Sequence, residues 1–210
     1  MPINSNREYR SMTMDVVTKE DEDRMIVAGY ASTFNDPYTL MENDVIVYRE
    51  QVSPDAFKDA DMSDVIMQYD HKGRVFARIT NNTLRVVPDE RGLFIEADLG
   101  GTELGRQLYE EIKGGYTDKM SFGFVVDDDV ETRTNLDDGR VEYTRTIRGI
   151  SKLYDVSAVS IPANDATSIS VRNLTDGVID QIRAERLEAE ALELRRRKLL
   201  AKARLNGGQK

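Results

Sequence analysis

Lys-Met-Ser-Phe-Gly-Phe-Val-Val, the segment at residues 119–126, predicts a β-strand around which the rest of the chain is organised. Phe and Val favour a pleated, half-buried surface. Because side chains alternate between the two faces of a strand, one face carries Met120, Phe122, Phe124 and Val126 and the other carries Ser121, Gly123 and Val125. The second face has little bulk near Ser121, so we expect room there for another molecule to approach the hydroxyl.

The composition of the 210-residue chain excludes several classes of site. There is no Cys, which excludes disulfides, thiolate zinc sites and a cysteine nucleophile. The single histidine, His71, excludes a His-rich metal site within one chain. Acidic runs at residues 127–129 and 137–138 lack the spacing of a twelve-residue calcium loop. We therefore expect no metal and no cofactor.

Charge and hydropathy narrow the possible partners. The chain has a net charge of −9, whereas a nucleic-acid-binding protein usually carries a basic surface patch. The basic run at residues 195–198 is typical of a solvated helix face. No apolar run reaches the about 18 residues that a membrane span needs, and residues 1–8 lack the apolar core of a signal peptide. We expect a soluble intracellular protein that binds neither nucleic acid nor membrane.

Short β-favouring runs follow one another along most of the chain. Close loops at residues 81–82 and 89–92 predict an antiparallel meander through three of them, and Asp127–Asp138 predicts a mobile acidic loop. The predicted strands occupy residues 25–34, 45–48, 65–69, 74–79, 83–87, 93–99, 119–126, 141–147, 151–161 and 166–171. This pattern predicts an α+β fold that is mainly antiparallel β, with a closed β-barrel flanked by helices.

Helical patterns occur in three places. Ser53 as a cap followed by Pro54 predicts a short helix that ends near residue 60. Residues 102–113 predict a longer helix, because apolar residues recur every four positions. From Thr175 to Arg204, Ala, Leu, Glu and Arg predict a long exposed or coiled-coil helix. We therefore divide the chain into an N-terminal extension or edge strand (1–24), a β-barrel domain (25–173) and a helical C-terminal arm (174–210).

Ser121, His71 and Asp155 together predict a serine hydrolase. A serine hydroxyl becomes a good nucleophile when a base takes its proton, and the base is usually a His oriented by a carboxylate. His71 follows a predicted strand and precedes a turn glycine, while Asp155 lies inside a predicted strand. A carboxylate buried there needs a donor, which a protonated imidazole would provide.

Each of these residues also has a purely structural explanation. Ser121 could fill a tight place in a β-core, and His71 could be a turn residue beside Asp70. Asp155 could lie in water at the barrel rim. Asp70 is the local alternative for orienting His71, although adjacent residues in an extended segment point in opposite directions. Spacing alone does not bring the three candidates into contact.

Two blocks of the chain are distinctive: Met-Ser-Phe-Gly-Phe at 120–124 and Leu-Tyr-Asp-Val-Ser-Ala-Val-Ser-Ile-Pro-Ala at 153–163. Weaker ones are Gly-Tyr-Ala-Ser-Thr-Phe at 29–34, Ser-Pro-Asp-Ala-Phe at 53–57 and Tyr-Asp-His-Lys at 69–72. In these blocks the chain resembles the HK97-type phage prohead (capsid maturation) proteases, which are distant relatives of the herpesvirus assembly protein proteases. The resemblance runs from residue 25 to about residue 172, with the block at 120–124 similar to the nucleophile strand and the block at 153–163 to the third block of that family.

This resemblance implies a serine endopeptidase with Ser121 as the nucleophile, His71 as the general base and Asp155 as the orienting acid. The sequence departs from the family at Asp155, where members often carry Glu, and at Asp70, where they often carry Asn. The implied substrates are the scaffolding segment of the major capsid protein precursor and the protease itself. We expect a homo-oligomer, such as a dimer, that works inside the procapsid in the host cytoplasm.

Two further expectations complete the prediction. Backbone N–H groups must hold the developing oxyanion, and residues 162–165 are the candidate donors. The alternative function is non-enzymatic: a scaffold- or capsid-binding β-domain whose C-terminal helix binds partners and whose Ser–His pair is vestigial.

Overall fold

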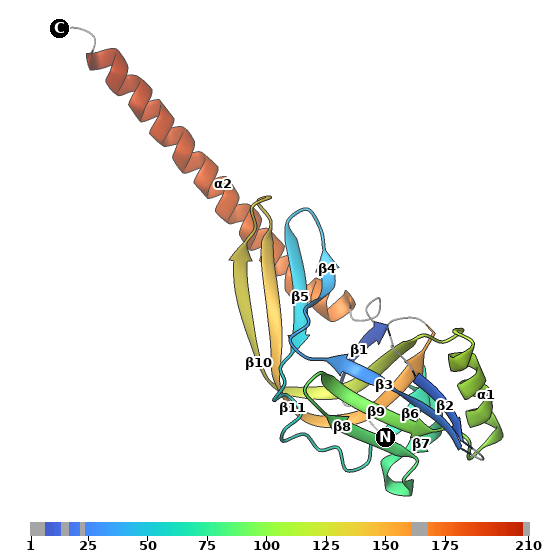
Figure 1. Ribbon diagram of the computed structural model, residues 1–210. Coiled ribbons are helices and arrows are strands. Elements are labelled where there is room, and N and C mark those ends of the chain that lie inside the picture. The colour runs from blue at the N-terminus through green and yellow to red at the C-terminus, as the bar shows by residue number, and fades with distance from the viewer. Residues whose placement is uncertain (1–6, 14–16, 22–23, 161–167, 208–210) are drawn as a thin grey trace.

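The computed structural model describes residues 7–13, 17–21, 24–160 and 168–207, and in them the chain is mainly β with two α-helices (Figure 1). The strands form two sheets. The larger sheet contains β1 (Glu8–Thr13), β4 (Tyr38–Glu42), β5 (Ile46–Val52), β6 (Ile66–Tyr69), β7 (Lys72–Arg78), β10 (Lys119–Asn135) and β11 (Val141–Val159). The smaller sheet contains β2 (Val17–Asp21), β3 (Arg24–Thr33), β8 (Leu84–Pro88) and β9 (Gly92–Asp98).

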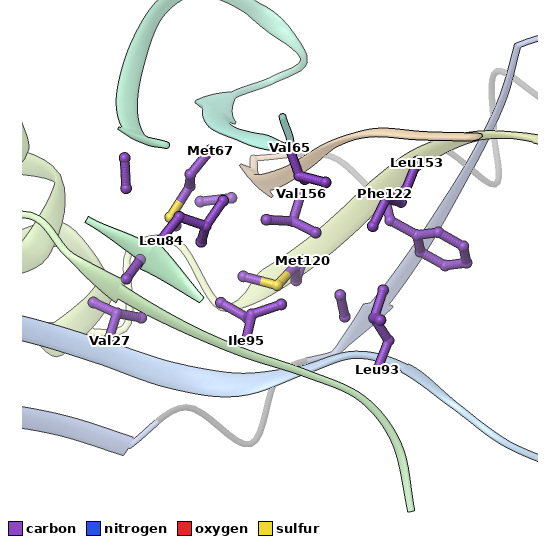
Figure 2. Close-up of a cluster of buried hydrophobic side chains, with 14 of the residues drawn as sticks. Val27, Val65, Met67, Leu84, Leu93, Ile95, Met120, Phe122, Leu153 and Val156 are labelled. Carbon is purple, nitrogen blue, oxygen red and sulfur yellow. The ribbon is translucent and has the colours of Figure 1, made fainter. Parts of the chain in front are cut away.

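The two sheets share one hydrophobic core, to which the strand around Ser121 contributes its bulky face. Phe122 and Phe124 stack with their ring centroids 4.6 Å apart. Figure 2 shows residues of both sheets in this core, all completely buried: Met120, Phe122 and Val156 from the larger sheet, and Val27, Leu93 and Ile95 from the smaller one. Burial of this apolar surface fixes which face of β10 points inward, and so leaves Ser121 on the opposite face.

The predicted closed β-barrel is wrong, because neither sheet closes on itself in the described part of the chain. The larger sheet runs in the order β1–β10–β11–β5–β4, and β6 and β7 branch from β11. β11 pairs with β5 over residues 141–147 and with β6 over residues 155–158, so the sheet forks instead of curling round. Both of these pairings are parallel, whereas the sequence predicted antiparallel neighbours.

The predicted meander is also only partly correct. β8 and β9 pair as an antiparallel hairpin, as expected. β7, however, pairs with β6 in the larger sheet and not with β8. The 3₁₀ turn η1 (Ile79–Asn81) carries the chain from one sheet to the other. The residues expected to form a hairpin loop therefore connect the larger sheet to the smaller one.

β10 and β11 form a long hairpin that extends well past the core. The predicted mobile loop at residues 127–138 is wrong as far as Asn135, because this residue still pairs with Val141. The exposed aspartates of this part of β10 face arginines of β11: Arg148 donates to Asp128 at 2.9 Å and Arg145 to Asp129 at 2.5 Å. The chain reverses only at residues 136–140, where Gly139 has a φ of +86°.

The helices differ from the predictions mainly at their ends. α1 (Glu103–Lys113) confirms the predicted body helix, and the N–H of Gly105 donates to the hydroxyl of its cap Thr102 at 3.0 Å. α2 (Ser168–Gly207) begins earlier than predicted, so the expected strand at 166–171 is wrong for residues 168–171, and residues 166–167 lie outside the described part. Residues 54–59 form successive turns instead of a helix.

Buried ion pairs hold β1 against the larger sheet. Arg10 and Glu50 are completely or almost completely buried, and Arg10 Nη2 donates to Glu50 Oε2 at 2.8 Å. Arg145 on β11 donates both to Glu50, at 2.9 Å, and to Glu8, at 2.8 Å. Because buried charges are stable only when paired, these contacts fix β1 beside β10. The side chains next to Arg10 along β1 then lie over the other face of the sheet.

Candidate active site

Ser121 lies on β10 between two core residues, with Ser11 of β1 and Ser157 of β11 as its cross-strand neighbours. Its side chain points to the face opposite the core. The structure buries Ser121 completely. The prediction of open space around its hydroxyl is therefore wrong, because β1 pairs along this edge of β10 and His71 covers the hydroxyl.

Asp155 lies on β11, close to Ser121, and has no exposed surface. This burial rules out the explanation that Asp155 is a solvated rim residue. Its Oδ1 accepts a hydrogen bond from Ser157 Oγ at 2.6 Å, and its Oδ2 lies against the guanidinium of Arg7 in an ion pair. A buried carboxylate needs such partners to offset the loss of water.

His71 reaches the site from the turn between β6 and β7. Tyr69 pairs with Lys72 across this hairpin, so Asp70 and His71 form a two-residue loop. Both have a positive φ, +48° for Asp70 and +55° for His71. These are the signs that a type I′ turn requires. The turn sends the imidazole back over the sheet, and its ring centroid lies 4.3 Å from that of Tyr9.

The imidazole of His71 bridges the other two predicted residues. Its Nε2 lies 2.6 Å from Ser121 Oγ, and its Nδ1 lies 2.5 Å from Asp155 Oδ1. Both are hydrogen-bond distances. The three side chains come from β10, the β6–β7 turn and β11. The structure brings them together with the imidazole between the hydroxyl and the carboxylate.

The electrostatic surroundings favour a neutral imidazole. Burial and the positive charge of Arg7 lower the pKa of His71 to about 4, while the carboxylate of Asp70 opposes this change. At neutral pH the ring can then donate from Nδ1 to Asp155 and keep a free electron pair on Nε2. This protonation state allows Nε2 to accept the proton of Ser121.

Asp70, the alternative orienting acid, is engaged elsewhere. Its carboxylate accepts hydrogen bonds from Ser160, from the backbone N–H at 2.9 Å and from the hydroxyl at 2.9 Å. The carboxylate that contacts Nδ1 of His71 is that of Asp155.

Comparison with known proteins assigns the chain to a family. A family model described as caudovirus prohead serine protease matches residues 12–178, which is more than half of the chain. The chain belongs to this prohead serine protease family. The resemblance predicted from the sequence is thereby confirmed.

Two known proteins are similar to this chain. The prohead protease of Enterobacteria phage HK97 is 29% identical over 157 residues, which cover 73% of this chain and 62% of that protein. The chain therefore spans less than two thirds of the length of that relative. The bacteriophage T4 capsid assembly protease, gp21, has a TM-score of 0.42 and 10% identity, covering 75% of this chain and 98% of gp21.

Two residues that shape the site were not predicted from the sequence. Arg7 contacts Asp155 and lies between the rings of Tyr9 and Tyr154, 5.1 and 4.6 Å from their centroids. It falls in a polar segment without any pattern, so no signal in the sequence identifies it. Gly123 makes room for this pair, because an added Cβ would lie 2.5 Å from Asp155 Oδ2. Its place two residues from Ser121 on the same strand face was the available signal.

The described residues also bear on metal sites and membrane spans, but not on the predicted oxyanion donors. No group of three or more His, Asp or Glu side chains suited to a metal ion occurs among those that the structure describes. Within the same residues, no helix is both long and apolar enough to span a membrane. The candidate oxyanion donors at residues 162–165 lie outside the described part of the chain.

Proposed function

We propose that this protein is a serine endopeptidase of prohead maturation, with Ser121 as nucleophile, His71 as general base and Asp155 as orienting acid. The observation that carries the proposal is the single imidazole that lies within hydrogen-bond distance of both the Ser121 hydroxyl and the Asp155 carboxylate. The family assignment supports the same reaction class.

The first half of the reaction forms an acyl-enzyme. Nε2 of His71 takes the proton of Ser121 Oγ as this oxygen attacks the carbonyl carbon of the substrate peptide bond. The resulting imidazolium donates from Nδ1 to Asp155, whose negative charge stabilises it. The proton then passes from Nε2 to the leaving amine, and the C–N bond breaks to leave an ester on Ser121.

Water completes the cycle by the same route. His71 takes a proton from water as the hydroxyl attacks the ester, and then returns it to Ser121 Oγ as the carboxylic acid product leaves and ionises in water. Because Ser121 has no exposed surface in the structure, a peptide reaches it only after the groups that cover the hydroxyl move.

The proposed substrates follow from the relative and not from the site. The HK97 protein is named as a prohead protease. We propose that this protein cleaves the scaffolding segment of the capsid precursor and itself, inside the procapsid of the infected host cell.

A serine-directed label tests the nucleophile. A small fluorophosphonate should modify the full-length protein once, at Ser121, because only a hydroxyl next to a neutral imidazole is sufficiently nucleophilic. The pKa of His71 is lowered to about 4, so the labelling rate should fall as the pH drops through about 4 and should stay nearly constant near pH 6.5. Intact-protein mass and peptide mapping measure both the site and the rate.

The controls separate specific labelling from surface reaction. Ser121→Ala should remove the modification, whereas Ser151→Ala, at an exposed serine of β11 outside the site, should leave it unchanged. Labelling at another serine would show that this serine, and not Ser121, is the nucleophile. No labelling at any pH would favour the non-enzymatic capsid-binding alternative.

We further propose that α2 is an arm that binds partners and places the enzyme in the capsid shell. Ile182 anchors it by packing against Ile46 and Val141. Beyond this anchor the helix projects from the body (Figure 1). It carries exposed leucines at Leu187, Leu192, Leu194 and Leu199. Such exposed apolar residues on an extended helix favour an interaction surface.

Truncation after Arg186 should separate the arm from the proposed active site. Removing residues 187–210 keeps the anchor at Ile182 and the ion pair between Arg133 and Glu185, at 2.9 Å. We expect peptidase activity on a soluble peptide to be retained and incorporation into capsids to fall. A matched variant with the four exposed leucines replaced by Gln should behave in the same way. Unchanged incorporation in both variants would contradict the proposed role of the arm.

A further inference from the structure

The loop that presents His71 has an unusual backbone. Asp70 and His71 are consecutive residues with left-handed φ values of +48° and +55°, and neither is Gly. A Cβ makes this conformation unfavourable, and two-residue loops of this kind prefer Asn or Asp followed by Gly. Asp70 suits its position, but His71 occupies the place of the preferred Gly. The surrounding structure must therefore hold this turn in shape.

The contacts that hold the turn come from the end of β11. The N–H of Asp70 donates to the carbonyl of Ala158 at 3.0 Å and so extends the pairing of β6 with β11 by one residue. The carboxylate then closes on Ser160, accepting from its N–H through Oδ1 at 2.9 Å and from its hydroxyl through Oδ2 at 2.9 Å. The turn is thus tied to the strand that carries Asp155.

We infer that Asp70 is a positioning residue: by binding Ser160, its carboxylate locks the 70–71 turn onto the end of β11 and holds the imidazole of His71 between Ser121 and Asp155. This inference rests on the proposed function and gives Asp70 a role different from that of an orienting acid. Asp70 acts through the backbone of the turn. The groups that face the ring itself are Ser121, Asp155, Arg7 and Tyr9.

Two substitutions at position 70 separate the hydrogen bonds from the backbone and the charge. Asp70→Gly accepts a positive φ freely but loses every contact with Ser160. Asp70→Asn keeps an acceptor oxygen for the Ser160 N–H and tolerates the left-handed region, but loses the negative charge. We expect Asp70→Gly to lower kcat by about 10- to 100-fold with little change in KM, because small displacements of a catalytic group are costly. In Asp70→Asn, kcat should stay within about threefold of the wild-type value.

The single imidazole in the chain provides a readout that does not depend on activity. In untagged full-length protein that carries Ser121→Ala to prevent self-cleavage, His71 should give one downfield Nδ1 proton resonance from its short hydrogen bond to Asp155. Adding Asp70→Gly should weaken or abolish this resonance, and Asp70→Asn should retain it. Asp89→Gly is the matched control, because Asp89 also accepts from two N–H groups of a hairpin turn, at 2.8 and 3.0 Å, but far from the site.

Each outcome of these measurements either supports or contradicts the role of Asp70. Loss of the resonance in Asp70→Gly, with retention in Asp70→Asn and Asp89→Gly, supports the inference. An unchanged resonance and kcat in Asp70→Gly would overturn it, as would an equal loss in Asp70→Asn, which would assign the effect to charge. If the wild type cleaves no peptide, the proposed function fails, while the resonance still decides whether Asp70 positions His71.

Discussion

Replacing Ser121 with Ala is expected to lower the rate of peptide-bond cleavage by about a millionfold. In the proposed mechanism the substitution removes the oxygen that would form the acyl-enzyme, and it leaves His71 and Asp155 in place. Ser121 is buried beside other small side chains of its face, so loss of one hydroxyl leaves no large cavity. It removes the hydrogen bond to Nε2 of His71, which should lower the free energy of unfolding by about 1 kcal/mol. The mass of the full-length protein during prolonged incubation measures self-cleavage, and accumulation of uncleaved capsid precursor measures cleavage in trans.

Ser63→Ala is a suitable control for this experiment. Ser63 is exposed, and its hydroxyl donates only to the nearby Asp61 at 2.6 Å. This variant should shorten with time at the wild-type rate, within experimental error. If purified Ser121→Ala shortens at the wild-type rate, Ser121 is not the nucleophile.

The strand around Ser121 could be predicted because its signal is local. Alternating bulky residues identify the buried face, and the structure buries Met120, Phe122 and Phe124 completely. Most other strands of the body follow from similar runs. The neighbours of each strand could not be predicted, because alternation does not specify which edge pairs with which. The fork of β11 between β5 and β6, which rules out the closed barrel, depends on contacts between segments far apart in sequence.

The same distinction applies to the site. Residue types and resemblance together suggested the grouping of Ser121, His71 and Asp155, and the structure brings their side chains together. Their catalytic roles stay a prediction. The left-handed turn at His71 could not be predicted, because His has no preference for a positive φ and the contacts that hold it come from β11. Arg7 is a stronger example. It reaches Asp155 because β1 pairs with β10, and the partners of Arg10 and Glu8 on β5 and β11 help to hold β1 there.

Asp155→Asn is expected to slow peptide cleavage by about 10⁴-fold. An amide at this position carries no negative charge to stabilise the imidazolium, and its N–H₂ can donate to Nδ1 and force the proton onto Nε2. The imidazole could then no longer accept the proton of Ser121. Steady-state kinetics on a peptide substrate measure the loss, which should appear in kcat. Asp70→Asn should have a much smaller effect, and the reverse order would make Asp70 the orienting acid.

Stability must be separated from catalysis in this variant, because Asp155 also pairs with Arg7. Asp155→Asn leaves the half-buried Arg7 guanidinium without its carboxylate, and a charge that has lost both water and its partner is destabilising. The double variant Arg7→Gln/Asp155→Asn removes that charge and should recover much of the lost thermal stability. Its kcat should stay as low as that of Asp155→Asn, since the carboxylate is still missing. Recovery of kcat together with stability would mean that Asp155 serves only to pair with Arg7 and has no part in orienting His71.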